Sequence, residues 1–274
     1  MKAFTLDIWK DFSYRGEMQD GFRPTLDAYI LKSETARPAV LVLPGSGYTK
    51  CSPREAEALA VRFNAAGYHS FVLWYSCTPR RYPVSVLDCC RAFTIIREHS
   101  GEWQLDPDKI AMLGFSAGGH LALSQTLFYG ESADVPGINT ALCRTDALLL
   151  GYPVISSGPF AHMGSFNALL GEKPDQRLLE HLSLENQIIP GLPPVFLWHT
   201  YTDEGVPVEN SLLLASALRK AGIPLEMHIF PEGKHGLSLA IPETMAGVPE
   251  NVNLHAAQWF SLCLNWLALQ FQPR

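Results

Sequence analysis

The sequence predicts an α/β fold in which a mostly parallel central sheet carries helices on both faces. Short apolar runs alternate with segments of helical periodicity along most of the 274 residues. One of these runs, Ala39–Leu43 (AVLVL), is aliphatic throughout, which is typical of a strand buried on both sides. From Ala39 onward, the order of strand, crossover and strand allows successive strands to lie parallel in one sheet.

The expected elements follow in chain order. The first two strands, Phe4–Trp9 and Leu26–Leu31, have no helix between them, so we expect an antiparallel N-terminal edge. The later strands are expected at Ala39–Leu43, His69–Tyr75, Lys109–Gly114, Asp146–Leu150, Pro194–Trp198 and Leu225–Phe230. The helices are expected at Pro53–Ala66, Pro83–His99, Gly118–Tyr129, Val208–Ala221 and Asn253–Phe271, several of them bounded by Pro at the start or Gly at the end.

The chain is predicted to form a single domain over residues 1–274, because no repeat, linker or low-complexity tract divides it. One segment interrupts the alternation of strands and helices. Residues 152–190 lie between two strands and are longer than a minimal connection, with a short helical piece at Gln176–His181. Long insertions at the end of a strand commonly form binding loops, so we expect a small cap-like insertion here.

Composition limits the partners of the chain. The formal net charge is −6, from 21 Lys and Arg against 27 Asp and Glu, which argues against nucleic acid and anionic membrane surfaces. No apolar stretch approaches the roughly 18 residues of a membrane span. The N-terminal segment meets Asp7, Lys10 and Asp11 early and lacks the apolar core of a signal peptide, so a cytoplasmic protein is expected. A homo-oligomer is compatible with these observations.

The strongest local motif is Gly114-Phe115-Ser116-Ala117-Gly118, a G-x-S-x-G between an expected strand and an expected helix. In that context the serine occupies a sharp turn at the carboxyl end of its strand, with its hydroxyl exposed above the sheet. A Gly-rich turn without chemistry would give the same five letters, but the flanking strand and helix favour a nucleophile.

A serine nucleophile needs a base, and the base needs an orienting acid. His235 directly follows a late strand in the glycine-bounded loop Phe230–Gly236, whereas most other histidines fall inside expected strands or helices. His120 is close to Ser116 in sequence but is expected to be structural. Asp203 ends the preceding strand and is favoured as the acid over Glu204, which could instead complement the N-terminus of the following helix.

The attacked carbonyl becomes an oxyanion and needs N–H donors aimed at it. The N–H of Ala117 is one candidate, and the turn Pro44–Tyr48 after an early strand should supply others, although that turn could also serve only to reverse the chain.

With these motifs, the chain resembles α/β hydrolases of the acetyl esterase/lipase family, which includes carbohydrate acetyl esterases and esterases similar to hormone-sensitive lipase. The resemblance lies in LPGSGY, YPVSVLDCCRAF, DPDKIAMLGFSAGGHLAL, FLWHTYTDEGVPVENS and FPEGKHGLSL. It implies Ser116, Asp203 and His235 as a catalytic triad and Ser46, Gly47 and Ala117 as oxyanion donors. Relatives often carry H-G-G-G or P-G-G-G in the first loop, so Ser46 stands where they have glycine.

The predicted function is that of a serine carboxylic-ester hydrolase that removes short acyl groups, in particular acetyl, without a metal or organic cofactor. By family analogy its small-molecule ester substrate includes acetylated xylo-oligosaccharides or other sugars. The pocket aromatics Tyr48, Tyr152 and Phe160 could stack on a sugar ring or could simply form the pocket wall. A broad carboxylesterase, a serine peptidase and a non-catalytic binding protein are the alternatives.

Overall fold

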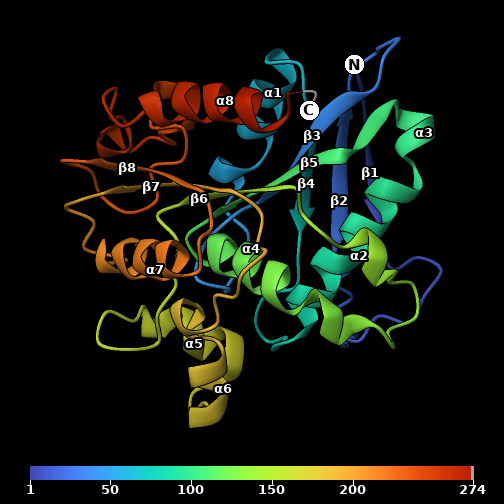
Figure 1. Ribbon diagram of the computed structural model, residues 1–274. Coiled ribbons are helices and arrows are strands. Elements are labelled where there is room, and N and C mark those ends of the chain that lie inside the picture. The colour runs from blue at the N-terminus through green and yellow to red at the C-terminus, as the bar shows by residue number, and fades with distance from the viewer. Residues whose placement is uncertain (273–274) are drawn as a thin grey trace.

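The computed structural model describes residues 1–272. Eight strands form one sheet in the order β1-β2-β4-β3-β5-β6-β7-β8 (Figure 1). β2 is antiparallel to both β1 and β4, and every pairing from β4 to β8 is parallel. The strands are β1 Lys2–Asp7, β2 Thr25–Ile30, β3 Arg37–Leu43, β4 His69–Trp74, β5 Leu105–Phe115, β6 Ala147–Gly151, β7 Val195–Thr200 and β8 Leu225–Phe230. The predicted fold class and its antiparallel N-terminal edge are therefore confirmed.

Helices cover both faces of the sheet. In Figure 1, α1 and α8 lie above it, and α2, α4 and α7 lie below. The helices are α1 Glu57–Ala65, α2 Val84–Glu98, α3 Ser100–Trp103, α4 Ala117–Phe128, α5 Met163–Leu170, α6 Gln176–His181, α7 Glu209–Lys220 and α8 Gln258–Gln270. Short 3₁₀ turns are found at Pro53–Glu55, Tyr129–Ser132, Thr140–Leu142, Leu184–Asn186, Pro242–Thr244 and Pro249–Asn251.

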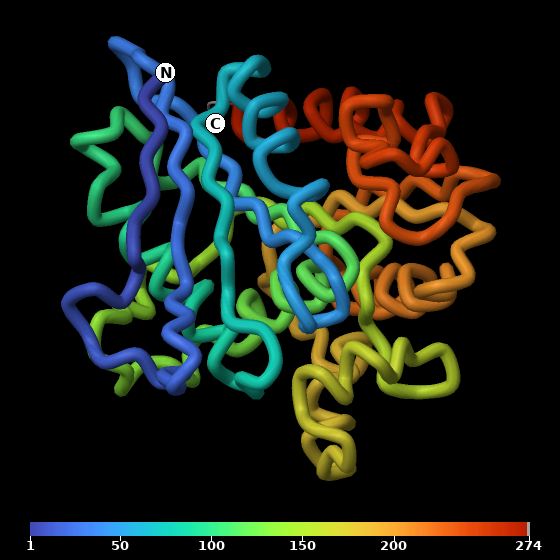
Figure 2. Tube along the Cα trace, turned by 180° about the vertical axis from the view of Figure 1, so that it is seen from behind, coloured from blue at the N-terminus to red at the C-terminus, as the bar shows by residue number. Residues whose placement is uncertain are grey.

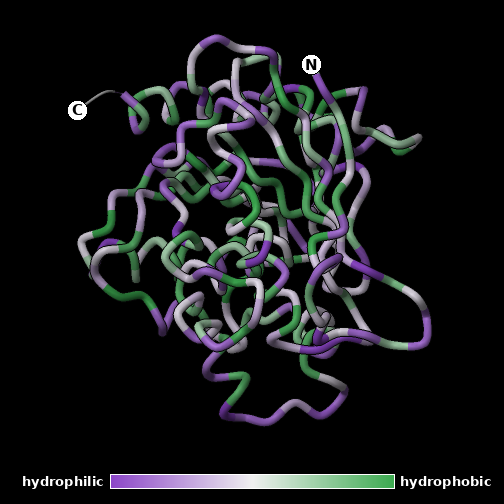
Figure 3. The backbone as a smooth tube through the Cα atoms, turned by 90° about the vertical axis from the view of Figure 1, so that its right-hand side faces the viewer, coloured by the Kyte–Doolittle hydropathy of each residue, from purple (hydrophilic) through white to green (hydrophobic). Residues whose placement is uncertain are grey.

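The core has two layers because the sheet is buried on both faces. Along β3, Ala39, Leu41 and Leu43 belong to one layer, while Val40 and Val42 belong to the other. This alternation is the period of two expected of a strand, with apolar residues on both sides. Figure 3 shows the corresponding distribution along the backbone, with hydrophobic stretches running through the interior and hydrophilic ones mainly in the outer loops.

Two expected helices differ from the structure at their starts. The expected helix Pro53–Ala66 is divided, because Ala56 has φ −117° and ψ −106° and separates a 3₁₀ turn from α1. The expected helix Asn253–Phe271 begins only at Gln258. Asn253 instead organises a separate turn, in which its side chain accepts from the Ala256 N–H and its carbonyl accepts from the Ala257 N–H.

The segment 152–190 carries α5 and α6 and projects from the body of the molecule below α7, as Figures 1 and 2 both show. The short helix expected at Gln176–His181 is confirmed as α6. The sequence did not indicate α5, whose eight residues contain a glycine and begin at a histidine cap. The segment is anchored by a hydrogen bond between the Leu182 carbonyl and His120 Nε2 of α4, at 3.0 Å.

Candidate active site

Ser116 lies on the sharp turn between β5 and α4. Its φ of 51° and ψ of −119° are unusual for a residue with a side chain and place it where the strand becomes the helix. The flanking glycines make this turn feasible: a Cβ on Gly114 would lie 2.2 Å from the Gly118 carbonyl oxygen, and one on Gly118 would lie 2.1 Å from that of Leu43. Any larger residue at either position would push the turn at Ser116 away from the sheet.

Ser116, His235 and Asp203 are hydrogen-bonded in series. The distance between Ser116 Oγ and His235 Nε2 is 2.8 Å, and that between His235 Nδ1 and Asp203 Oδ2 is 2.7 Å. The carboxylate accepts at Nδ1, so the neutral ring carries its hydrogen there and leaves Nε2 free to accept the serine proton. The three residues follow the carboxyl ends of β5, β8 and β7, respectively. Glu204, the alternative acid, makes no hydrogen bond to His235 among residues 1–272.

Asp203 is held as a carboxylate by an unusually complete set of donors. Its Oδ1 accepts from the N–H groups of Gly205 and Val206, each at 2.9 Å, and its Oδ2 accepts from both His235 and His199. Burial by itself would raise the pKa of Asp203, but the hydrogen bonds from His199 and His235 outweigh it and hold that pKa well below its usual range. An ionised carboxylate at this position orients the His235 ring through the hydrogen bond to its Nδ1.

His199 is a member of this network that sequence reasoning missed. Its Nε2 lies 3.2 Å from Asp203 Oδ2 and 3.0 Å from the Val206 carbonyl, and its Nδ1 lies 2.7 Å from Ser211 Oγ. With two acceptors at Nε2, that nitrogen carries the hydrogen, and the Ser211 hydroxyl donates to Nδ1. The only sequence signal was a histidine at the end of a strand, four residues before Asp203.

The loop after β3 lies directly against the nucleophile. A Cβ on Gly45 would come within 2.6 Å of the Phe115 carbonyl oxygen and 2.9 Å of Ser116 Cβ. Ser46 and Gly47 follow with φ of 124° and 63°, and both line the same cavity as Ser116. The N–H of Ala117 opens α4, where a helix has no internal acceptor for it. The structure therefore places Ser46 and Gly47 around the cavity that Ser116 lines, with Ala117 directly after Ser116 at the start of α4.

The cavity above Ser116 has a volume of about 410 Å³. It is lined by Ser46, Gly47, Thr49, Ser52, Arg54, Glu55, Ser116, His162, Gly164, His235 and Gly236. Within the described part of the chain, no aliphatic or aromatic hydrocarbon side chain lines this cavity.

The three aromatic residues expected to line the pocket are placed elsewhere, which corrects that prediction. Tyr48 is 2% exposed and its hydroxyl is hydrogen-bonded to His120 Nδ1 at 2.8 Å. Tyr152 is 1% exposed, with its ring packed edge-on against the ring of His235. Phe160 is exposed but lies outside the cavity lining. Positive φ values of 59° at Tyr48 and 37° at Tyr152 accompany these inward positions.

His162 lines the cavity from the 152–190 insertion and was also missed by sequence reasoning. It caps α5, where its Nδ1 accepts from the Ser165 N–H at 3.2 Å and lies 2.8 Å from Ser165 Oγ. Burial and the neighbouring His235 lower the pKa of His162, so the ring is neutral near pH 7 and its hydrogen lies on Nε2. No residue in the described range accepts from that Nε2–H, which leaves a donor for a ligand.

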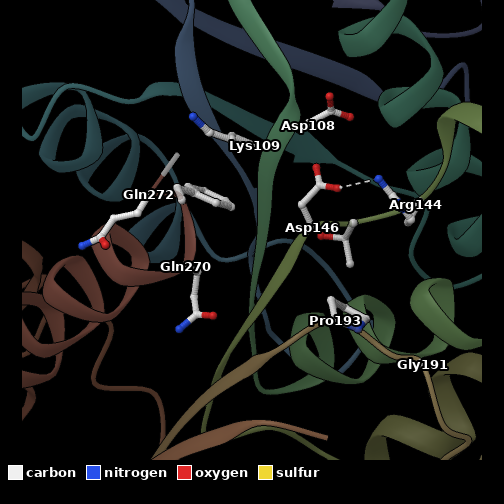
Figure 4. Close-up of a pocket in the computed structure, with 10 residues that line it drawn as sticks. Asp108, Lys109, Arg144, Asp146, Gly191, Pro193, Gln270 and Gln272 are labelled. Carbon is white, nitrogen blue, oxygen red and sulfur yellow. Dashed lines mark ion pairs between the residues drawn. The ribbon is translucent and has the colours of Figure 1, made fainter. Parts of the chain in front are cut away.

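A second cavity, of about 600 Å³, lies near the amino-terminal ends of β5 and β6 (Figure 4). It is lined by Asp108 and Lys109 of β5, by Asp146 just before β6, and by Gln270 at the end of α8. Asp146 is paired there with Arg97 at 2.8 Å and with Arg144 at 3.3 Å. This cavity is remote from Ser116, because Asp108 and Lys109 lie in the first half of β5, whereas Ser116 follows the carboxyl end of that strand.

No group of three or more His, Cys, Asp or Glu side chains within residues 1–272 is arranged to hold a metal ion. In the same range, no helix is long and apolar enough to cross a lipid bilayer.

The fold and much of the sequence match known proteins. An acetyl ester-xyloside bifunctional hydrolase from Caldicellulosiruptor lactoaceticus superposes with a TM-score of 0.86 at 39% identity, over 97% of this chain and 96% of that one. This chain belongs to the α/β hydrolases, in the acetyl esterase group. A carboxylesterase from Lactobacillus plantarum is similar to this hydrolase at 27% identity with a TM-score of 0.79, over 98% of both chains.

Family models match two parts of the hydrolase. Residues 26–148 match the BD-FAE model, and residues 163–261 match the prolyl oligopeptidase family. Among curated relatives, endo-1,4-beta-xylanase B of Butyrivibrio fibrisolvens is 37% identical over 90% of this chain and 40% of its own length. The acetylxylan esterase of Xylanibacter ruminicola is 27% identical over 86% of this chain and 48% of its own length. The hydrolase thus spans about half or less of these two relatives.

Proposed function

We propose that the protein is a serine ester hydrolase that removes acetyl and other short acyl groups from acetylated sugars, with xylo-oligosaccharides as the first substrates to test. The observation that carries the proposal is a hydrogen-bonded Ser116–His235–Asp203 series at the floor of a small polar cavity. A lining of hydroxyl, guanidinium and imidazole groups suits a hydroxyl-rich alcohol. It offers no apolar channel for a long acyl chain.

In the proposed mechanism, Ser116 Oγ attacks the ester carbonyl while its proton passes to His235 Nε2. Asp203 stabilises the resulting imidazolium. The N–H groups of Ala117, Ser46 and Gly47 receive the oxyanion. His235 then gives its proton to the departing sugar hydroxyl, which leaves an acyl-enzyme on Ser116. Water, deprotonated by His235, attacks that ester and releases the carboxylic acid, so Ser116 regains its proton and the cycle closes.

The names of relatives support the choice of a sugar ester. Two of them are an acetyl ester-xyloside hydrolase and an acetylxylan esterase. A broad carboxylesterase would share the triad and differ in its tolerance of longer acyl groups. The match of residues 163–261 to the prolyl oligopeptidase family covers Asp203 and His235, which is the reason to include a peptide substrate in the test.

The test is a substrate panel with wild-type protein and a Ser116→Ala control. We expect kcat/KM to fall from p-nitrophenyl acetate to the butyrate and octanoate esters, acetate to be released from acetylated xylo-oligosaccharides, and no cleavage of a prolyl p-nitroanilide. Rates that rise with acyl length would favour a broad carboxylesterase over a hydrolase of sugar esters. Cleavage of the anilide would favour a peptidase.

A further inference from the structure

Glu55 is a buried carboxylate that contacts two different loops of the site. It ends the 3₁₀ turn Pro53–Glu55 and is 3% exposed. Its Oε2 accepts from the Gly45 N–H at 2.7 Å, and its Oε1 accepts from the Tyr152 hydroxyl at 2.6 Å. One side chain thereby joins the oxyanion loop to the residue that follows β6.

The connection continues into the loop that carries the base. The Ser238 N–H donates to the Tyr152 hydroxyl at 2.8 Å, and the Ser238 hydroxyl donates to the Arg54 carbonyl at 2.6 Å. The Tyr152 ring also lies edge-on to the ring of His235, with centroids 5.1 Å apart. A shift of the Tyr152 hydroxyl would therefore displace both the oxyanion loop and the loop that contains His235.

Arg54 strengthens the same junction from the neighbouring position. Its Nε donates to the Thr244 carbonyl at 2.6 Å and its Nη1 to the Gly236 carbonyl at 2.8 Å. Both acceptors belong to the segment that follows β8 and contains His235. Residues 54 and 55 together thus contact the loop after β3, the residue after β6 and the segment after β8.

The geometry points to Glu55 as a positioning residue that fixes the oxyanion loop and the histidine loop relative to Ser116. The inference rests on the proposed function, since it takes Ser116 as the nucleophile. Gly45 packs against Ser116 so tightly that even a methyl group there would clash, so the anchoring of its N–H sets the location of the next two N–H groups. The polar chemistry of Glu55 is entirely satisfied by protein atoms, as a positioning role requires.

A displaced N–H donor weakens stabilisation of the transition state more than binding of the substrate, because the oxyanion forms only in the transition state. Substrate binding before attack does not use that charge. Loss of Glu55 should therefore lower kcat and leave KM nearly unchanged. Displacements of about 1 Å at a reacting centre can cost on the order of 100-fold in rate.

The test compares Glu55→Gln, Tyr152→Phe and the double variant on p-nitrophenyl acetate. Gly45 and Tyr152 donate to different oxygens of Glu55, and a glutamine in the same position has an NH2 group in place of one of them, so one of the two donors loses its acceptor. We expect Glu55→Gln to lower kcat by about 10- to 100-fold with KM within about threefold. Tyr152→Phe should act in the same direction but less strongly. The double variant should lose much less than the product of the two single losses, because both substitutions interrupt one network.

Asp146→Asn is the matched control. Asp146 is likewise a buried carboxylate, and it accepts from the backbone N–H of Ile110 at 3.0 Å, but it lies near the amino-terminal ends of β5 and β6. The Asp146→Asn substitution should lower the melting temperature and keep the wild-type kcat of the folded protein. A structural role for Glu55 would give the same pattern as Asp146→Asn.

The outcomes separate this inference from the proposed function. Activity in Ser116→Ala would contradict the proposed nucleophile itself. An inactive Ser116→Ala together with wild-type kcat in folded Glu55→Gln would overturn the positioning role alone. If Glu55→Gln does not fold, Tyr152→Phe decides: a lower kcat at unchanged KM supports the role, and wild-type kcat overturns it.

Discussion

At the scale of single residues, Ser46 has a backbone conformation that normally belongs to glycine. Its φ of 124° is in a region that side chains rarely adopt, and such positions cost on the order of 1–3 kcal/mol. In the proposed mechanism only its backbone N–H takes part. We therefore expect Ser46→Gly to unfold at a higher temperature than Ser46→Ala, by about 1 kcal/mol in stability, with activity retained in both. Thermal unfolding and p-nitrophenyl acetate assays check this; an inactive Ser46→Ala would assign a role to the hydroxyl instead.

His162 offers a prediction about substrate selection. Its unpaired Nε2–H should donate to the alcohol part of a sugar ester, and one such hydrogen bond contributes about 1 kcal/mol. We expect His162→Ala to raise KM about fivefold for acetylated xylo-oligosaccharides and to leave p-nitrophenyl acetate kinetics within twofold. Steady-state kinetics on both substrates measure this. An equal change for both would mean that His162 only supports the insertion.

Some site residues could be predicted from the sequence and others could not, for physical reasons. Ser116, Asp203 and His235 each follow an expected strand, close to glycine or proline residues that mark a turn. The structure places the three side chains in hydrogen-bond contact. Glu55 lies within the expected helix Pro53–Ala66, and the helical pattern does not distinguish it from the other charged residues there. The break at Ala56 turns it inward, and sequence periodicity does not report such a break. Tyr152 was misplaced because its hydroxyl donates to the buried Glu55, so the ring is 1% exposed and does not line the cavity.

At the scale of elements, α2 is tied to the N-terminal edge by Asp88. This residue is fully buried and accepts from Trp9 Nε1 at 2.7 Å and from the Ser76 N–H at 2.9 Å. Burial raises the pKa of Asp88 to about 6, despite the hydrogen bonds from Ser76 and Trp9. Because the folded pKa is above the unfolded one, the native state retains a proton that the unfolded chain releases, and this contribution to stability is lost as pH rises from about 4 to about 6.

The corresponding prediction concerns stability as a function of pH. The difference in unfolding free energy between wild type and Asp88→Asn should decrease by about 3 kcal/mol from pH 4 to pH 7. Urea unfolding of both proteins across that range measures it. A difference that does not change with pH would show that Asp88 ionises normally.

Most elements could be predicted because each long apolar run is a strand buried on both faces. β5 extends further than expected, to Leu105–Phe115, because its first residues pair only with the start of β3 at Arg37. α5 was missed because eight residues around a glycine give too short a helical pattern. In both cases tertiary contacts decide the local structure.

At the scale of the whole molecule, the sheet joins the N-terminal and C-terminal parts of the chain. Its order places β3 between β4 and β5, and each core layer contains residues from both halves. We therefore expect one cooperative transition in calorimetry, with equal calorimetric and van't Hoff enthalpies. Two separate transitions would contradict the single domain. The 152–190 insertion should unfold with the rest, since His120 anchors its Leu182 carbonyl.

The central claim is that Ser116 is the nucleophile of an ester hydrolase, and covalent labelling tests it most directly. Folded wild-type protein treated with a fluorophosphonate should gain the mass of one adduct, located on the peptide that contains Ser116. Ser116→Ala should gain none, should lose nearly all hydrolysis of p-nitrophenyl acetate, and should keep nearly the wild-type melting temperature. An adduct that forms equally well in Ser116→Ala, or hydrolysis that persists near the wild-type rate, would contradict the account.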